Sequence, residues 1–519
     1  MSSPRQGRLV VLVNIAVAIG LIVFVASVSP FRQHAAPPTV SEFAPAGGRA
    51  LNDVHASRPT PAATARGRHG PVALPKPKSA RGVPPQLACY RWSDGLVTQT
   101  FDPQSPPCIS RWAVAQGNGG ATAAGVTATT VRIGVNRASL SALRRYAGWF
   151  NSHFELYGRT LQLVGLDLSD LASPESQQAA ALEASQQRVF AVLLSPPPSS
   201  TVAAPPQQFL DTAADHGILV LLGRTTQASS TTLAALSPYA WSYAPGLDVL
   251  ERAAGDLLCQ LMAGRRAALS PDEANRTRRF GVVVPDAAHA GGDDFDVQSL
   301  ESELEECHTP ARVERFDPNS PTSAGEALQR LRLAGVTTII PLLGPGPVAR
   351  VLMPAAEGES YRPEWVLSGI DDDPAQALWS LAPQKQLRAL AGLASWQPSP
   401  SASLQPASRA VSGTTDVAGY RSMLMLASGI QLAGTQLTPS SFANGLSGTA
   451  FPNPGAGRSP LYQAAVGFDD LDHAMVDDVA LARWSPSRSG FCLADHGRRW
   501  TFGNLPQDPA LLDLPRDCT

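Results

Sequence analysis

The stretch that decides the fold is "TTVRIGVNRASLSALRRYAGWFNSHFELYGRTLQLVGL", residues 129–166. Its first seven and its last seven residues are short apolar runs, and each predicts a strand. Between them Leu143, Ala147, Phe150 and Phe154 recur at helical spacing, so an amphipathic helix is expected. A strand, a helix and a strand in this order indicate a parallel sheet, because parallel strands need a long crossover between them.

The same alternation continues to about residue 245 and then repeats. Ser173 followed by Pro174 predicts a helix start, and Ser323 with Glu326 reads as a capping box. Two successive sets of similar size predict an α/β fold of two doubly wound parallel-sheet lobes. The further strands expected from apolar runs are "VFAVLL" (189–194), "GILVLL" (217–222), "RFGVVV" (279–284), "ARVERF" (311–316), "VTTIIPLL" (336–343) and "EWVLSGI" (364–370).

The N-terminus predicts a membrane anchor. Residues 9–28 carry no charge and, at about 1.5 Å per residue, would extend roughly 30 Å, enough to cross a bilayer. Arg5 and Arg8 precede this stretch and predict that residues 1–8 stay in the cytoplasm while the folded part is extracytoplasmic. A cleaved signal peptide is the alternative, but residues 25–27 make a poor cleavage site and the apolar run is long.

The remaining chain divides by composition. Residues 29–86 are rich in Pro and Ala without apolar periodicity, which predicts a disordered linker. The other expected boundaries are 87–123 for a cysteine-bracketed segment, 124–245 for lobe 1, 246–390 for lobe 2, 391–480 for a return segment that completes the lobes, and 481–519 for a cysteine-bracketed tail.

Six cysteines in an exported chain predict disulfides. Six allow about 15 connectivities, so the pairing stays open, although pairing between neighbours closes the shortest loops. Those pairs are Cys89–Cys108, Cys259–Cys307 and Cys492–Cys518. No spacing fits a zinc ribbon or a redox CxxC motif, so neither a metal nor a cofactor is expected. With 16% charged residues and a net charge of -2, nothing indicates nucleic acid as a partner.

Six segments in order resemble the type I periplasmic binding proteins, in particular their branched-chain amino-acid receptor-like branch, also described as leucine-binding-protein-like. The resemblance covers about residues 124–480 and implies two lobes joined by a hinge of three crossings, closing on a solute. The segments that carry it are "GVTATTVRIGV", "FNSHFELYGRTLQLV", "YAWSYAPGLDVLERAAGDLL", "RFGVVVPD", "LQRLRLAGVTTIIPLL" and "EWVLSG".

The resemblance also implies a ligand site at the carboxyl ends of the strands, where open parallel sheets bind ligands. "FAVLLSPPPSS" (190–200) ends a strand in such a loop. A ligand carboxylate is expected at Ser195, Ser199, Ser200, Thr225 and Thr226, and a ligand ammonium at Asp371 or Asp372. Tyr243, near the first crossing, is a candidate aromatic wall. Asn136, Arg137 and Arg224 also follow first-lobe strands, where the two arginines could bind a carboxylate or phosphate.

Three functions follow. The first is a membrane-anchored solute-binding protein that captures a small polar metabolite, amino-acid-like or another carboxylate, for an ABC transporter permease or for sensing. The second is a ligand-free structural or signalling module on the same fold, favoured because "NRASLS" (136–141) replaces the family's Ser-Gly-Pro type loop. An exported hydrolase ranks third, since the sequence has no GxSxG or HExxH motif. No enzyme activity is expected.

Overall fold

The computed structural model describes residues 89–91, 97–99, 101–102, 104–171, 173–194, 206–223, 228–286, 297–370, 378–395, 405–413, 416–451 and 464–512. The chain divides into two units, residues 1–69 and 70–519, and every described residue belongs to the second. Among the described residues, none of the helices has the length and apolar character needed to cross a membrane. The expected cytoplasmic end (1–8), anchor (9–28) and linker (29–86) lie outside this part of the chain.

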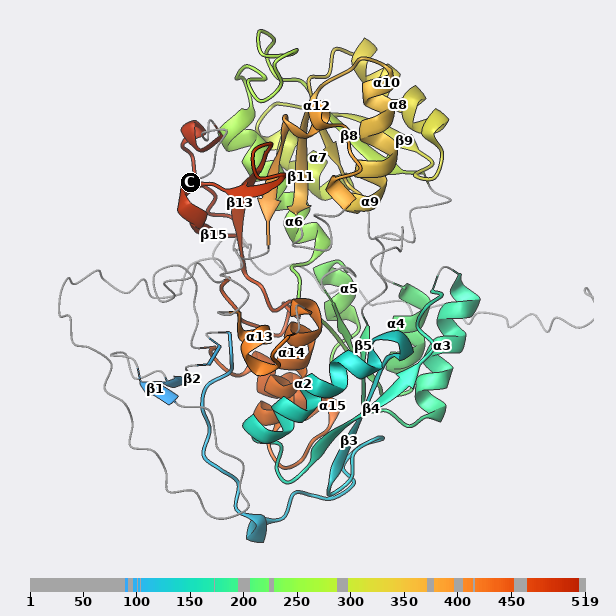
Figure 1. The fold of residues 1–519 in the computed structure, drawn as a ribbon, viewed down its shortest axis with the longest axis vertical. Coiled ribbons are helices and arrows are strands. Elements are labelled where there is room, and N and C mark those ends of the chain that lie inside the picture. The colour runs from blue at the N-terminus through green and yellow to red at the C-terminus, as the bar shows by residue number, and fades with distance from the viewer. Residues whose placement is uncertain are drawn as a thin grey trace, which may run out of the picture. The chain divides into compact units, whose positions relative to one another are not determined.

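The first lobe contains a five-stranded parallel sheet in the order β4-β3-β5-β6-β7 (Figure 1). The alternation of apolar strands and amphipathic helices in the sequence produces this order, with a helix between successive strands. Its elements are β3 (Thr130–Asn136), η2 (Arg137–Ser139), α2 (Leu140–His153), β4 (Thr160–Leu166), α3 (Pro174–Gln186), β5 (Ala191–Leu194), α4 (Gln207–Asp215), β6 (Leu219–Leu222), α5 (Ser230–Ala235) and β7 (Ala240–Ser242).

Successive residues of these strands face opposite sides of the sheet, and both sides are covered. In β5, Ala191 and Leu193 join the core beneath α2, whereas Val192 and Leu194 join the core beneath α3 and α4. All four side chains are buried. Strands buried on both faces read as continuous apolar runs, which explains the "VFAVLL" pattern in the sequence.

The second lobe repeats the topology. Its sheet has the order β14-β13-β12-β11-β10-β8-β9, with β15 also paired to β13, and the five strands β8 to β12 are parallel. Its elements are α6 (Leu247–Leu257), η3 (Leu258–Met262), β8 (Phe280–Pro285), α7 (Val297–Glu306), β9 (Arg312–Phe316), α8 (Pro321–Leu333), β10 (Thr338–Pro341), α9 (Pro345–Pro347), η4 (Val348–Leu352), α10 (Met353–Gly358), β11 (Glu364–Ile370), α12 (Gln384–Leu387) and β12 (Leu390–Ala394). The α/β prediction of two parallel-sheet lobes is confirmed.

The chain then returns to the first lobe before ending in the second. Helices α13 (Pro406–Ala410), α14 (Val417–Ala433) and α15 (Pro439–Ser447) pack into the first-lobe core. The tail follows as β13 (Asp478–Ser485), β14 (Gly490–Leu493), η6 (Asp495–Gly497), β15 (Arg499–Thr501) and η7 (Pro509–Leu512). Strand β13 pairs antiparallel with β12, and β14 and β15 pair antiparallel with β13. The chain therefore crosses between the two cores three times.

The segment before the first lobe contributes β1 (Cys89–Arg91), β2 (Val97–Gln99) and η1 (Val114–Gln116). Strands β1 and β2 form an antiparallel pair of their own. Between β2 and η1 the chain packs against the first lobe, where Asp102, Gln104 and Ser105 are almost completely buried. This segment therefore forms part of the first-lobe core.

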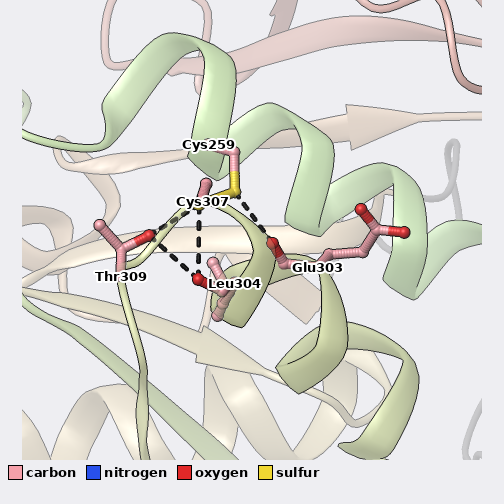
Figure 2. The surroundings of a disulfide bond; sticks show 5 residues. All are labelled: Cys259, Glu303, Leu304, Cys307 and Thr309. Atoms are coloured by element: carbon pink, nitrogen blue, oxygen red, sulfur yellow. Dashed lines mark hydrogen bonds between the residues drawn. A yellow bond between two sulfur atoms is a disulfide. The ribbon is translucent and has the colours of Figure 1, made fainter.

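A disulfide joins Cys259 of η3 to Cys307, which follows α7 (Figure 2). The Thr309 hydroxyl lies 2.8 Å from the Cys307 sulfur, and the Cys259 sulfur lies 3.3 Å from the Glu303 carbonyl oxygen. Cys108 and Cys492 are also disulfide-bonded. Of the three neighbouring pairs expected from the sequence, the Cys259–Cys307 pair is present, and the pairing of Cys108 and of Cys492 stays a prediction.

Two expected helix starts had different outcomes. Ser173 caps α3, with Pro174 as its first residue. The capping box expected at Ser323 and Glu326 is wrong: α8 begins at Pro321, and Ser320 is its cap. Proline is favoured as the first helical residue, so the chain starts the helix one turn earlier, and Ser323 supplies the backbone N–H that Ser320 accepts.

Candidate functional site

The expected ligand residues follow the carboxyl ends of the parallel strands. Because β3, β5, β6 and β7 are parallel, their carboxyl ends meet along one edge of the first-lobe sheet. Three of the expected residues are described there: Asn136, Arg137 and Tyr243. The others lie outside the described residues and keep their role as predictions: Ser195, Ser199, Ser200, Arg224, Thr225, Thr226, Asp371 and Asp372.

Asn136 and Arg137 lie where β3 passes into η2. The Asn136 side-chain oxygen accepts a hydrogen bond of 2.9 Å from the backbone N–H of Ala138 and so caps η2. The Arg137 guanidinium lies 3.4 Å from a carboxylate oxygen of Glu183, and its side chain is 66% exposed. An exposed ion pair of this kind contributes little stability, so this guanidinium can turn to another anion at little cost.

Tyr243 follows β7 directly, and its backbone N–H donates to the carbonyl of Leu222 at the end of β6. Its side chain does not line an open surface, because the residue is only 8% exposed and belongs to the first-lobe core. The hydroxyl points to the side-chain oxygen of Gln104, 3.5 Å away. A role for Tyr243 as an aromatic wall against a ligand stays a prediction.

Next to Tyr243 lies a buried ion pair that the sequence reasoning missed. An Arg421 nitrogen lies 2.5 Å from a carboxylate oxygen of Asp102, and the two side chains are 7% and 0% exposed. The other oxygen of Asp102 accepts from the backbone N–H of Gln104 at 2.9 Å. Burial lowers the pKa of Arg421, but the carboxylate of Asp102 together with Tyr243 and Tyr420 outweighs burial and holds this pKa above its usual value. The guanidinium is therefore permanently charged.

This pair lies close to the ligand edge of the first-lobe sheet. Helix α2 leaves that edge after β3, and the Tyr146 hydroxyl in α2 donates to the carbonyl of Asp416, just before α14. Helix α14, whose fifth residue is Arg421, therefore begins beside α2. Through Gln104, Asp102 lies near Tyr243, which follows β7 at the edge where the ligand residues are expected. The sequence contained one signal: Arg421 is the only charged residue in an otherwise uncharged helix.

A buried ion pair of the second lobe lies at the amino-terminal edge of its sheet. Glu364 is the first residue of β11, and its two oxygens accept from Arg278 at 2.7 and 2.9 Å. The backbone N–H of Leu269 and the Thr338 hydroxyl complete the contacts, at 2.8 and 2.7 Å. Glu364 is completely buried. This cluster connects the amino ends of β10 and β11 and the residue Arg278 that precedes β8. It therefore stabilises the second lobe at the edge opposite to the one where the ligand residues are expected.

Comparison with known proteins identifies the family. The family model described as "Periplasmic binding protein" matches residues 125–490. This chain belongs to that family. The match begins after Asp102 and ends before Arg499, so parts of both cysteine-bracketed segments lie outside it. Among curated protein sequences, none matches the chain.

Solved structures with the same fold include solute-binding proteins of ABC transporters. A solute-binding protein from Rhodopseudomonas palustris in complex with 4-hydroxybenzoate has a TM-score of 0.52 and 14% identity, and the match covers 73% of this chain and 98% of that one. A periplasmic binding protein from Burkholderia mallei has a TM-score of 0.52 and 13% identity, covering 74% and 96%. A fatty acid ABC transporter substrate-binding protein from Thermomonospora curvata has a TM-score of 0.50 and 13% identity, covering 76% and 97%. At these identities the likeness concerns the fold.

Proposed function

We propose that this protein is an extracytoplasmic solute-binding protein, anchored by residues 9–28, that captures a small polar metabolite for an ABC transporter or for sensing. The observation that supports it best is the doubled topology. Both lobes have the same parallel strand order, and three crossings of the chain connect their cores. The family consists of non-catalytic binding proteins, so we infer binding without turnover.

We infer that the ligand carries a carboxylate. Arg137 at the end of β3 is exposed and only weakly paired, and Arg224 follows β6 with Thr225 and Thr226. Arginine forms paired hydrogen bonds to planar anions, which suits a carboxylate. The solute named for the Rhodopseudomonas palustris protein, 4-hydroxybenzoate, is such an anion, and it serves as a first probe.

A ligand-free module is the second candidate, and one observation favours it. The side-chain oxygen of Asn136 and the hydroxyl of Tyr243 both meet partners inside the first lobe, so neither oxygen can meet a solute without rearranging. The same fold would then transmit contacts between proteins, with no solute between its lobes.

Native mass spectrometry of the full-length protein, purified in detergent, tests the proposal by detecting a co-purified small molecule. Titration calorimetry with 4-hydroxybenzoate, amino acids and fatty acids follows. We expect Arg224→Ala to weaken binding by about tenfold or more, since a charge-assisted contact contributes about 1.5–3 kcal/mol. Arg145→Ala, on the exposed face of α2, is the control. No bound molecule and no heat with any probe would favour the ligand-free module.

A further inference from the structure

The third crossing is confined to two residues. Met475 and Val476 belong to the first-lobe core, and Val479 belongs to the second-lobe core. The chain therefore passes from one core to the other at Asp477 and Asp478. The second crossing begins at Ser395, directly after β12.

One side chain from the tail connects these two crossings. Arg499, the first residue of β15, donates from Nε to a carboxylate oxygen of Asp478 at 2.7 Å and from Nη2 to the Asp478 carbonyl at 2.8 Å. The same Nη2 donates to the carbonyl of Ser395 at 3.1 Å. The guanidinium therefore contacts the third crossing through Asp478 and the second through Ser395.

The contact extends into the first lobe. The second carboxylate oxygen of Asp478 accepts from the backbone N–H of Ala465 at 2.9 Å, and the N–H of Asp477 donates to the Ala465 carbonyl at 3.1 Å. Ala464 and Val466, on either side of Ala465, belong to the first-lobe core. A chain of hydrogen bonds thus runs from the tail through the crossing into the other lobe.

The arrangement demands a specific geometry. The Arg499 and Asp478 side chains are 1% and 3% exposed, so each charge depends on the other for compensation. A buried pair of this kind adds little net stability compared with apolar residues of the same size, but it penalises any movement that separates its members. Because the guanidinium is planar and fixed in shape, it holds all three acceptors at once only when the crossings keep this spacing.

We propose that Arg499, supplied by the C-terminal tail, is a positioning residue that holds the second and third crossings together and sets the equilibrium between open and closed lobes. The inference concerns the crossings and not the solute. It therefore holds equally for a binding protein and for a ligand-free module, and its failure is distinct from failure of the proposed function.

Pulsed electron–electron resonance between spin labels at Gln178→Cys and Gln329→Cys tests it in the full-length protein. Both residues are exposed, one on α3 and one on α8, and the protein without added cysteines gives the labelling background. We expect Arg499→Lys and Arg499→Met to shift or broaden the distance between the labels by more than about 2 Å, the scale of domain rearrangements. Lysine keeps the charge but cannot hold three acceptors in a fixed plane.

Arg498→Met is the matched control, because Arg498 is the adjacent residue and is exposed; its guanidinium lies 3.6 Å from Asp495 and 5.8 Å from the centre of the Trp500 ring. The double variant Asp478→Asn with Arg499→Met leaves no unpaired buried charge. We expect it to recover part of the melting temperature lost in Arg499→Met while the label distance stays broadened. Unchanged distances in folded Arg499→Lys and in the double variant would overturn the proposal and leave the pair a purely structural contact.

Discussion

Asp472 provides a pH-dependent test of the segment that leads into the third crossing. The pKa of this carboxyl group is raised from 3.8 to about 6, mainly by burial and also by the carboxylates of Asp469 and Asp248, while the hydrogen bond from the N–H of Ala474 lowers it. Asp472→Asn removes the titrating group. It keeps an oxygen that can accept the 2.9 Å hydrogen bond from Ala474.

The sign and the size of the effect follow from proton binding. Between pH 3.8 and about 6 the folded protein binds more protons at this site than the unfolded chain, so its contribution to stability falls as the pH rises through this range. At about 1.36 kcal/mol per pKa unit, the full difference corresponds to about 3 kcal/mol. Since the side chain keeps some contact with solvent, we expect about 1–3 kcal/mol.

Urea unfolding of the full-length protein, followed by tryptophan fluorescence at several pH values, measures this difference. Asp472→Asn should be more stable than the wild type above about pH 7, and the difference should disappear only below pH 3.8, under the range where the site titrates. Asp470→Asn, two residues away and exposed, is the control and should show no such dependence. A difference that is independent of pH, or a variant less stable above pH 7, would refute the assignment.

Three further predictions concern stability, each measured by the same unfolding assay. Replacing both Cys259 and Cys307 by alanine removes a disulfide with a sequence separation of 48 and should lower the free energy of unfolding by up to about 4 kcal/mol. Reduction of this disulfide should destabilise the wild type but cannot act on the variant. Glu364→Gln leaves a buried arginine without its counter-charge and should cost about 3–5 kcal/mol. Gly429→Ala forces a methyl group into a buried phenylalanine of α15 and should cost about 1–3 kcal/mol, whereas Gly325→Ala, with open space around it in α8, should stabilise by about 0.5–1 kcal/mol.

These predictions fail in distinguishable ways. If the variant with alanine at Cys259 and Cys307 were as stable as the wild type under oxidising conditions, the disulfide would not constrain the unfolded chain. A Glu364→Gln variant as stable as the wild type would mean that the neighbouring arginine finds another partner. Similar effects of the two glycine substitutions would show that helix propensity, and not packing, dominates at Gly429.

The two lobes could be predicted from the sequence because local patterns of apolar residues determine their helices and strands. Phe150 and Leu250 each recur with neighbours at helical spacing, and both are buried. Apolar runs such as residues 189–194 became parallel strands because both faces of each sheet are covered. The local pattern gave the wrong start for α8. Ser320 and Ser323 could each cap this helix, and Ser320 is the cap because the proline that follows it is favoured as the first helical residue.

The site was less predictable, since its contacts join distant parts of the chain. Asp102 and Arg421 are separated by 319 residues, and no local pattern pairs them. A single charged residue in an otherwise uncharged, buried helix indicates that it has a partner of opposite charge, but the sequence does not identify which carboxylate is that partner. The serine, threonine and aspartate positions rest on the resemblance to the family, because they follow strands whose loops hold the ligand there.

The two cysteine-bracketed segments attach to the family fold in the same way. The first contributes Asp102 to Arg421 beside the ligand edge, and the tail contributes Arg499 to Asp478 at the third crossing. Apolar packing would tolerate sliding of these segments over the lobes, whereas a buried ion pair loses its compensation as soon as its members separate. Each segment is therefore fixed in register on the lobe that it covers. Because the first segment buries residues against the first lobe and the tail adds strands to the second-lobe sheet, removing either segment should destabilise the lobe to which it is attached.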